Sequence, residues 1–186
     1  MKYIDNQYYH IYNRGAHKAL IFFNSENYRY CLDVLKNNAS RHNVLIAAYC
    51  LMPNHYHLVM KQLDSGSISR CIQTTFNTYT QAINVRRNHS GTMFQGKAKA
   101  KLVNSDSYVF QLIRYVHLNP VEAQLVTRPE DWIFSDYADW AGIRERKTFN
   151  SSLRDMFFKN GEEYKEFVQQ HRREEIKKNI GRYLMD

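Results

Sequence analysis

The chain has 186 residues, of which 44% are hydrophobic, and this suffices for one domain with a single packed core. With 7 glycines and 3 prolines, the composition excludes fibrous repeats and low-complexity linkers. The longest apolar stretch, residues 44–52, is strand-sized and far below the ~18 residues of a membrane span. No signal-peptide pattern opens the chain, and its 3 cysteines lack C-x-x-C spacing, so we expect a reduced, cytoplasmic protein.

The charge balance is strongly basic. Lysine and arginine number 26 against 18 acidic residues, and 14 tyrosines and 10 phenylalanines accompany them. Positive charge together with many aromatic rings suits a polyanion with exposed bases, such as single-stranded nucleic acid. A soluble protein that is merely basic has the same composition, so charge alone leaves both interpretations open.

The first half of the chain predicts three strands and a helix. Residues 7–15 are aromatic and β-prone and stop at a glycine, which indicates a first strand. A helix with Ser25 as its N-cap is expected to reach about Arg41. The apolar run 44–52 indicates a buried strand, and the alternating residues 55–60 continue from it through a Pro-Asn turn, so the two predict a hairpin.

The second half predicts two more helices and a strand. Apolar spacing indicates a helix that begins at Ile68 and ends in residues 86–89, and a glycine-marked fourth strand over residues 92–103. A third helix is expected from residue 105 or 106 to about Asn119, because Pro120 disfavours helical geometry in the residue before it.

This order of elements, β-α-β-β-α-β-α, predicts an α+β protein with a ferredoxin-like split βαβ unit, an antiparallel sheet and additional C-terminal helices. We expect residues 1–127 to form this domain and residues 128–186 to pack on it. The aromatic anchors of that second part are Trp132, Phe134, Tyr137 and Trp140. A charged helix over residues 162–178 is expected to be peripheral.

His55 and His57 are the first residues that point to chemistry. Residues two apart on a strand share a face, so both imidazoles are expected to project side by side and to offer half of a divalent-metal site. Two surface histidines on a half-buried strand are the plain alternative. Metal binding explains better than surface exposure why two ionisable side chains lie at the start of a strand that we expect to be central.

Tyr115 and Asn119 form the second pair. They stand four residues apart and share one face of the third helix, where a phenol could act as nucleophile and an amide oxygen as a further metal ligand. His117 is expected to point away from them. A half-buried tyrosine and an asparagine that ends a helix explain the same spacing. If the first strand lies beside the strand of the histidine pair, as the split βαβ order requires, His10 could reach the metal or one of its ligands, but its role stays unassigned.

Basic residues are spread over several elements that could flank a DNA groove. The candidates are Arg14, Arg86, Arg87, Lys97, Lys99 and Lys101. The three lysines alternate, so on a strand they line one face as a row of phosphate contacts. Lysines that protect an exposed edge strand give the same pattern.

Four motifs together carry a family resemblance. They are YHIYNRG (residues 9–15), YCLMPNHYHLV (residues 49–59), FQGK (residues 94–97) and RYVHLNPV (residues 114–121). In this order they resemble the landmarks of the REP-associated tyrosine transposases, which are single-tyrosine members of the HUH endonuclease superfamily. The resemblance covers about residues 8–127.

The resemblance implies a metal-dependent endonuclease and strand transferase that acts on single-stranded hairpin DNA during transposition or REP-element mobilisation. It implies that His55 and His57 bind Mg²⁺ or Mn²⁺, and that Tyr115 attacks the DNA to give a 5′-phosphotyrosine and a free 3′-OH. Asn119 stands where the wider family has a glutamine as third metal ligand, and its shorter side chain is the main departure. No membrane is implied, and a homodimer is one option.

Two other functions remain open at this point. One is a non-catalytic module that binds single-stranded nucleic acid, with the aromatic residues of the first strand stacking on bases. The other is a small metal-dependent hydrolase that never traps DNA on a tyrosine. The joint presence of the histidine pair and the Tyr115–Asn119 pair favours the transferase.

Overall fold

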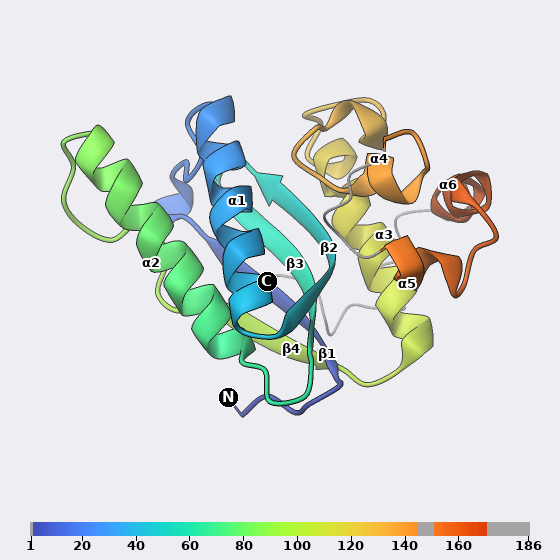
Figure 1. Cartoon of the computed structure of the whole chain (residues 1–186). Helices are drawn as coiled ribbons and strands as arrows, with labels where there is room; N and C mark the ends of the chain where they lie inside the picture. The colour runs from blue at the N-terminus through green and yellow to red at the C-terminus, as the bar shows by residue number, and fades with distance from the viewer. Residues whose placement is uncertain (1, 145–150, 171–186) are drawn as a thin grey trace.

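The computed structural model describes residues 2–144 and 151–170, and a four-stranded antiparallel sheet lies at its centre (Figure 1). The strands are β1 (Tyr8–Arg14), β2 (Val44–Met52), β3 (His55–Gln62) and β4 (Lys99–Val103). Their order in the sheet is β2-β3-β1-β4, so the first strand lies between the third and the fourth. This is the order of a split βαβ unit, and it confirms the predicted α+β class.

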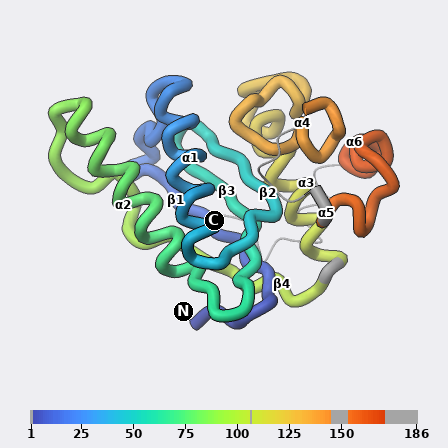
Figure 2. Tube along the Cα trace, in the orientation of Figure 1, coloured from blue at the N-terminus to red at the C-terminus, as the bar shows by residue number. Residues whose placement is uncertain are grey.

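Helices cover both faces of the sheet. The long ones are α1 (Ser25–Arg41), α2 (Ile68–Arg86) and α3 (Asp106–Glu122). The short ones are η1 (Ala16–Lys18), η2 (Pro129–Asp131), α4 (Tyr137–Trp140), α5 (Ser151–Asp155) and α6 (Gly161–Gln169). Figures 1 and 2 show α1 and α2 on one side of the sheet and α3 with α4–α6 on the other. Within the described ranges no helix combines the length and apolarity needed to cross a membrane.

Strand alternation divides the core in two. Tyr9 and Ile11 of β1 belong to the core beneath α1 and α2, whereas Val59 of β3 belongs to the core beneath α3. His10 pairs directly with Val59, so the even-numbered residues of β1 face α3. A register shift in β2 between Ile46 and Ala48 changes which residues face each core: Ile46 lies in the core beneath α1 and α2 before it, and Tyr49 and Leu51 do so after it. The α3 face of the sheet is therefore the one that carries the histidines of β1 and β3.

The chain after α3 returns to the free edge of β2. Cys50 and Ser135 form a β-bridge there, the Leu51 amide donates to the Phe134 carbonyl at 3.0 Å, and the Trp132 indole donates to the Leu51 carbonyl at 2.9 Å. The segment thereby satisfies backbone groups that an edge strand would leave open.

Two predicted boundaries are wrong. The N-cap of α1 is Asn24, whose side chain accepts from the Asn27 amide at 3.0 Å, and Ser25 is the first helical residue. The fourth strand covers only Lys99–Val103 rather than residues 92–103. Gly96 adopts a φ of 86° where the ladder with β1 is interrupted, and before it only Phe94 forms an isolated antiparallel bridge, to Gly15.

The predicted end of the third helix is also wrong, because α3 continues through Pro120 to Glu122. Proline lacks the N–H that would bond to the Val116 carbonyl, so one helical hydrogen bond is missing. The helix resumes at once, with the Ala123 amide donating to Asn119 at 2.9 Å. Val116 and Pro120 are both buried, and this packing outweighs the single lost bond.

The charged helix that we expected to be peripheral is partly a core element. Within α6, Tyr164 is fully buried and Val168 is 3% exposed, and both pack against the core beneath α3. Their four-residue spacing places them on one face, while the charged residues occupy the remainder. The later part of the predicted helix, residues 171–178, lies outside the described residues.

Candidate active site

His57 is the centre of the polar cluster on the α3 face. The ring is fully buried, and its Nδ1 lies 2.9 Å from Nε2 of His10 on the neighbouring strand. The two rings are stacked with centroids 5.1 Å apart. His57 Nε2 is buried without a hydrogen-bond partner. His10 contacts the Nδ1 atom of His57. The Nε2 atom of His57 is therefore a buried potential metal ligand that has no hydrogen-bond partner.

His55 lies two residues earlier on the same face, as the alternation predicts. Its ring centroid is 5.1 Å from that of His57, and its Nδ1 lies 2.7 Å from the Asn54 side-chain oxygen. When Nδ1 donates to that oxygen, the Nε2 of a neutral His55 keeps its lone pair. The turn between β2 and β3 therefore orients the second imidazole.

Both imidazoles are held in the neutral form. Burial lowers the pKa of His55 to about 4; a hydrogen bond with Asn119 opposes this shift, and the charge of Arg14 adds to it. Burial also holds the pKa of His57 well below its usual range, and His10 and His55 lower it further. A neutral imidazole is the form that binds a metal ion.

Helix α3 brings the predicted nucleophile to the histidines. The Tyr115 ring lies 5.6 Å from the His57 ring and 6.3 Å from the His10 ring, both edge-on. Burial raises the pKa of Tyr115, while a hydrogen bond from Asn119 opposes that shift. Asn119 also donates to the Tyr115 carbonyl at 2.9 Å. One chain thus brings together all four predicted residues of the site.

The helix takes this position because its apolar stripe packs on the sheet. Buried residues recur at helical spacing along α3, and they are Val109, Leu112, Ile113 and Val116. The stripe fixes the rotation of the helix, so Tyr115 emerges at its margin, above the polar residues of β1 and β3.

His117 points away from the site, as expected, and belongs to a network that we did not predict from the sequence. Its Nε2 lies 2.9 Å from Asp136 Oδ1, and its Nδ1 lies 2.5 Å from the Tyr164 hydroxyl. The same Asp136 oxygen accepts from the Tyr49 amide at 2.7 Å. The sequence feature that could have pointed to Asp136 is the presence of this acidic residue within a segment rich in aromatic residues. The network ties α3 to β2 and α6.

The residues present fit a divalent metal ion. The part of the chain that the structure describes holds no group of three or more His, Cys, Asp or Glu side chains suited to a metal. A metal at this position would therefore rely on two imidazoles and the amide oxygen of Asn119. The partnerless buried Nε2 of His57 and the neutral state of both rings are the observations that favour such a site.

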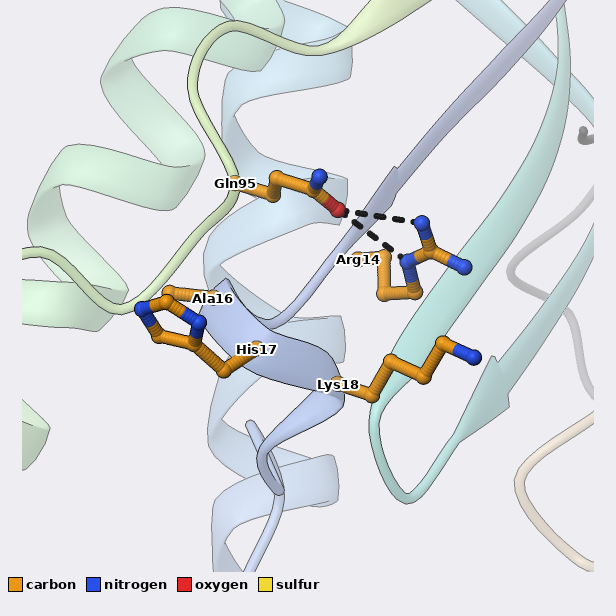
Figure 3. Close-up of a pocket in the computed structure, with 5 residues that line it drawn as sticks. All are labelled: Arg14, Ala16, His17, Lys18 and Gln95. Atoms are coloured by element: carbon orange, nitrogen blue, oxygen red, sulfur yellow. Dashed lines mark hydrogen bonds between the residues drawn. The ribbon is translucent and has the colours of Figure 1, made fainter.

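A basic pocket of about 390 Å³ lies where the chain leaves the end of β1 (Figure 3). Its lining residues are Arg14, Ala16, His17, Lys18 and Gln95. Arg14 pairs with His55 across β1 and β3, and its guanidinium donates to the Gln95 side chain at 3.1 and 3.2 Å. Figure 3 shows the charged ends of Arg14 and Lys18 on the same side of the segment, with His17 pointing to the other.

Glycine is required where the chain leaves β1 for this pocket. A Cβ on Gly15 would lie 2.0 Å from the Ala19 carbonyl oxygen, closer than any real contact. His17 and Lys18 follow with φ values of 53° and 61°, which non-glycine residues seldom adopt. This tight, strained turn is what places Lys18 beside Arg14.

The predicted row of lysines is only partly formed. Lys99 pairs with Tyr12 and Lys101 pairs with His10, and the two ammonium groups lie 5.9 and 5.5 Å from the centre of the Tyr12 ring. These two lysines therefore share the sheet face of His57. Lys97 precedes the strand in the irregular segment, so it does not continue their alternation.

The predicted arginines of the second helix lie in the other layer. Arg86 ends α2 and approaches Glu26 of α1 at 4.0 Å, and Arg87 stacks on the Phe23 ring at 3.7 Å. Neither belongs to the α3 face, so the structure does not bring them to the histidine pair.

Residues 3–119 match the family model described as transposase IS200 like, whereas no curated protein matches the chain in sequence. The fold is similar to that of a REP-associated tyrosine transposase bound to a REP hairpin. The TM-score is 0.66 at 13% identity, over 81% of this chain and 94% of that chain.

Two further solved structures share less of the fold. A putative transposase from Deinococcus radiodurans has a TM-score of 0.45 at 14% identity, over 62% of this chain and 92% of that one. A bacterial tRNA(His) guanylyltransferase-like protein in complex with GTP has a TM-score of 0.42 at 10% identity, over 67% of this chain and 70% of that one. Both similarities are too weak to bear on function. The family match, which spans well over half of the residues and contains the histidine pair, Tyr115 and Asn119, shows that the chain belongs to the IS200-like transposases.

Proposed function

We propose that the chain is a metal-dependent endonuclease and strand transferase for single-stranded hairpin DNA, which forms a 5′-phosphotyrosine intermediate on Tyr115. The observation that carries the proposal is the position of the Tyr115 ring, 5.6 Å from a buried imidazole with a partnerless nitrogen, within one chain. A nucleophile beside a metal-binding pair is the arrangement that phosphoryl transfer to a side chain requires.

His55, His57 and Asn119 are the proposed ligands. When bound, a divalent ion such as Mg²⁺ or Mn²⁺ would polarise the scissile phosphodiester and offset its developing negative charge. His10 orients the His57 ring through the 2.9 Å hydrogen bond, so that Nε2 faces the proposed site. Asn54 does the same for His55.

Tyr115 supplies the nucleophile. Its oxygen attacks phosphorus, the bond from phosphorus to the 3′-oxygen breaks, and that oxygen leaves with a proton as a 3′-OH. The tyrosine–phosphate bond conserves the energy of the broken phosphodiester, so a second 3′-OH can reverse the step and join new ends. Because burial raises the pKa of Tyr115, its phenol is protonated at neutral pH, and the proton must leave during the attack.

The basic residues next to the site are the proposed DNA contacts. Lys99 and Lys101 lie on the sheet face of His57, and Arg14 lies at the end of β1 opposite His55. Together they flank the site on two sides and could neutralise phosphates on either side of the scissile bond. A hairpin as the DNA partner is supported by the REP hairpin bound to the structural neighbour.

The non-catalytic binding module is disfavoured by the packing of the sheet. Such a module stacks bases on exposed aromatic rings of the sheet. In β1, Tyr9 is fully buried beneath α1 and α2, and the Tyr12 ring is packed against the His10 ring, with Lys99 and Lys101 over it. Neither ring is open to a base.

The test is incubation of the protein with single-stranded hairpin DNA in Mn²⁺ or in EDTA, followed by denaturing electrophoresis. We expect a protein–DNA adduct that withstands denaturation and forms only with the metal. A hydrolase would cut the DNA without forming an adduct, and a binding module would shift it only in native gels. Either outcome would contradict the proposal.

A further inference from the structure

Tyr12 is a second phenol in the site, and no role has been assigned to it so far. The residue is 1% exposed, and its hydroxyl is buried without a hydrogen-bond partner. Its ring lies 4.8 Å from the His10 ring and 6.2 Å from the His57 ring. The Tyr12 phenol also lies close enough to raise the pKa of Tyr115 electrostatically, after larger contributions from burial and other groups.

The sheet register places Tyr12 in one cross-strand row with two other functional residues. Tyr12 pairs directly with His57 on one side and with Lys99 on the other. Directly paired residues project from the same face, with Cβ atoms roughly 5 Å apart. The row therefore runs from an imidazole through a neutral O–H donor to an ammonium group, and Lys101 approaches the same ring from the next row at 5.5 Å.

A partnerless hydroxyl is not by itself a site, and Tyr56 on β3 shows why. The Tyr56 hydroxyl is also buried without a partner, but its ring faces the opposite core and stacks on Phe76 at 4.1 Å. No cation approaches it there among the described contacts. Tyr12 differs because its surroundings are those of an anion site: two lysines, an imidazole with a partnerless nitrogen and the proposed nucleophile.

We propose that Tyr12 is a catalytic residue that donates a hydrogen bond from its hydroxyl to a non-bridging oxygen of the scissile phosphate, with Lys99 and Lys101 balancing the charge. This inference rests on the proposed function. A donor aimed at phosphate oxygens stabilises the extra negative charge that develops as Tyr115 attacks. Tyr12 keeps its proton throughout, so the step adds no proton transfer to the reaction.

The first test is Tyr12→Phe, which removes one oxygen and keeps the ring between the histidines and the lysines. At saturating hairpin DNA and Mn²⁺, we expect the rate of adduct formation to fall roughly 100-fold, as when one donor to a developing charge is removed. The matched control is Tyr56→Phe, which removes an equally buried, equally partnerless hydroxyl from the other face. It is expected to react within about twofold of wild type.

The second test measures binding without metal or reaction. In EDTA, wild type is compared on two hairpins that differ only at the cleaved position, one with a phosphodiester and one with a neutral methylphosphonate. A charge-assisted hydrogen bond makes the first bind roughly tenfold more tightly. In Tyr12→Phe this preference is expected to shrink, whereas Tyr56→Phe retains it. A merely structural role for Tyr12 would leave the preference unchanged.

The outcomes separate the two proposals. If wild type forms no adduct, the proposed function fails and the role of Tyr12 fails with it. If wild type forms the adduct and Tyr12→Phe matches it in rate and in phosphate preference, only the role of Tyr12 is overturned. If Tyr12→Phe reacts slowly but still prefers the phosphodiester hairpin to the methylphosphonate hairpin as strongly as wild type does, the proposed contact between Tyr12 and the phosphate is also overturned.

Discussion

At the residue scale, the site is built from buried polar groups that the fold alone does not need. A buried nitrogen without a partner, such as His57 Nε2, destabilises a folded protein by about 1–3 kcal/mol. The neighbouring hydrogen bond to His10 orients this nitrogen without satisfying it. A ligand at this nitrogen would offset that cost, and a divalent ion is the ligand that we propose.

The affinity for a divalent metal should depend on both His57 and His10. His57→Ala removes a proposed ligand, so Mn²⁺ binding measured by calorimetry should be lost. His10→Ala removes only the partner that orients His57, and the affinity should fall by about 10–100-fold. Circular dichroism verifies that both variants fold. Wild-type Mn²⁺ affinity in His57→Ala would place the metal elsewhere.

The grouping of the candidate site residues could be predicted because each pair obeys a local spacing rule. His55 and His57 share a strand face, and Tyr115 and Asn119 share a helix face. Tyr12 and Asp136 escaped prediction for the opposite reason. Their partners come from other strands and helices, so no periodicity within one segment marks them.

At the element scale, β4 combines a structural face with a charged one. Ala100 and Leu102 pack against the core beneath α1 and α2, while Lys99 and Lys101 project to the face of His57. The alternation of lysines with apolar residues in the sequence already indicated that the strand has these two faces. The predicted strand was too long because nothing local showed that the ladder with β1 would be interrupted near Gly96, which leaves Phe94 in an isolated bridge to Gly15.

The charged face of β4 should be visible in the salt dependence of DNA binding. Replacing Lys99 and Lys101 with Gln should make the slope of log K against log salt shallower by about 1.4, at about 0.7 for each phosphate contact on a single strand. Affinity is measured by fluorescence anisotropy in EDTA. Replacing the exposed Arg29 and Arg41 of α1 with Gln removes the same charge from the opposite layer and should leave the slope nearly unchanged. Equal slopes for the two double variants would mean that DNA does not follow β4.

At the scale of the whole molecule, the segment after α3 holds that helix against the sheet. His117 of α3 contacts Asp136, which precedes α4, and Tyr164 of α6, and Asp136 in turn accepts from the backbone of β2. All of these groups are buried, so their hydrogen bonds are shielded from water. Tyr115 is two residues from His117, and its position therefore depends on residues outside the part that matches the family model.

The contribution of this network to stability can be measured. Tyr164→Phe leaves the ring in place but removes the hydroxyl that bonds to His117, and it should lower the free energy of unfolding by about 1–3 kcal/mol. Urea denaturation gives this value. Tyr30→Phe, at a half-buried position on α1, should change it by less than about 0.5 kcal/mol. Equal stability of Tyr164→Phe and wild type would show that α6 does not support α3 through this bond.

The central claim, that Tyr115 becomes covalently joined to DNA, is tested most directly by identifying the adduct. Labelled single-stranded hairpin DNA is incubated with Mn²⁺ and wild type, Tyr115→Phe or Asn119→Ala, and the trapped peptide is identified by mass spectrometry. Tyr115→Phe removes one oxygen and should bind the hairpin normally yet form no adduct. Asn119→Ala should form less adduct and recover in part at high Mn²⁺, because it loses a ligand but keeps the nucleophile. We predict a nucleotide attached to Tyr115 in wild type; an adduct in Tyr115→Phe, or one on another residue of wild type, would contradict the account.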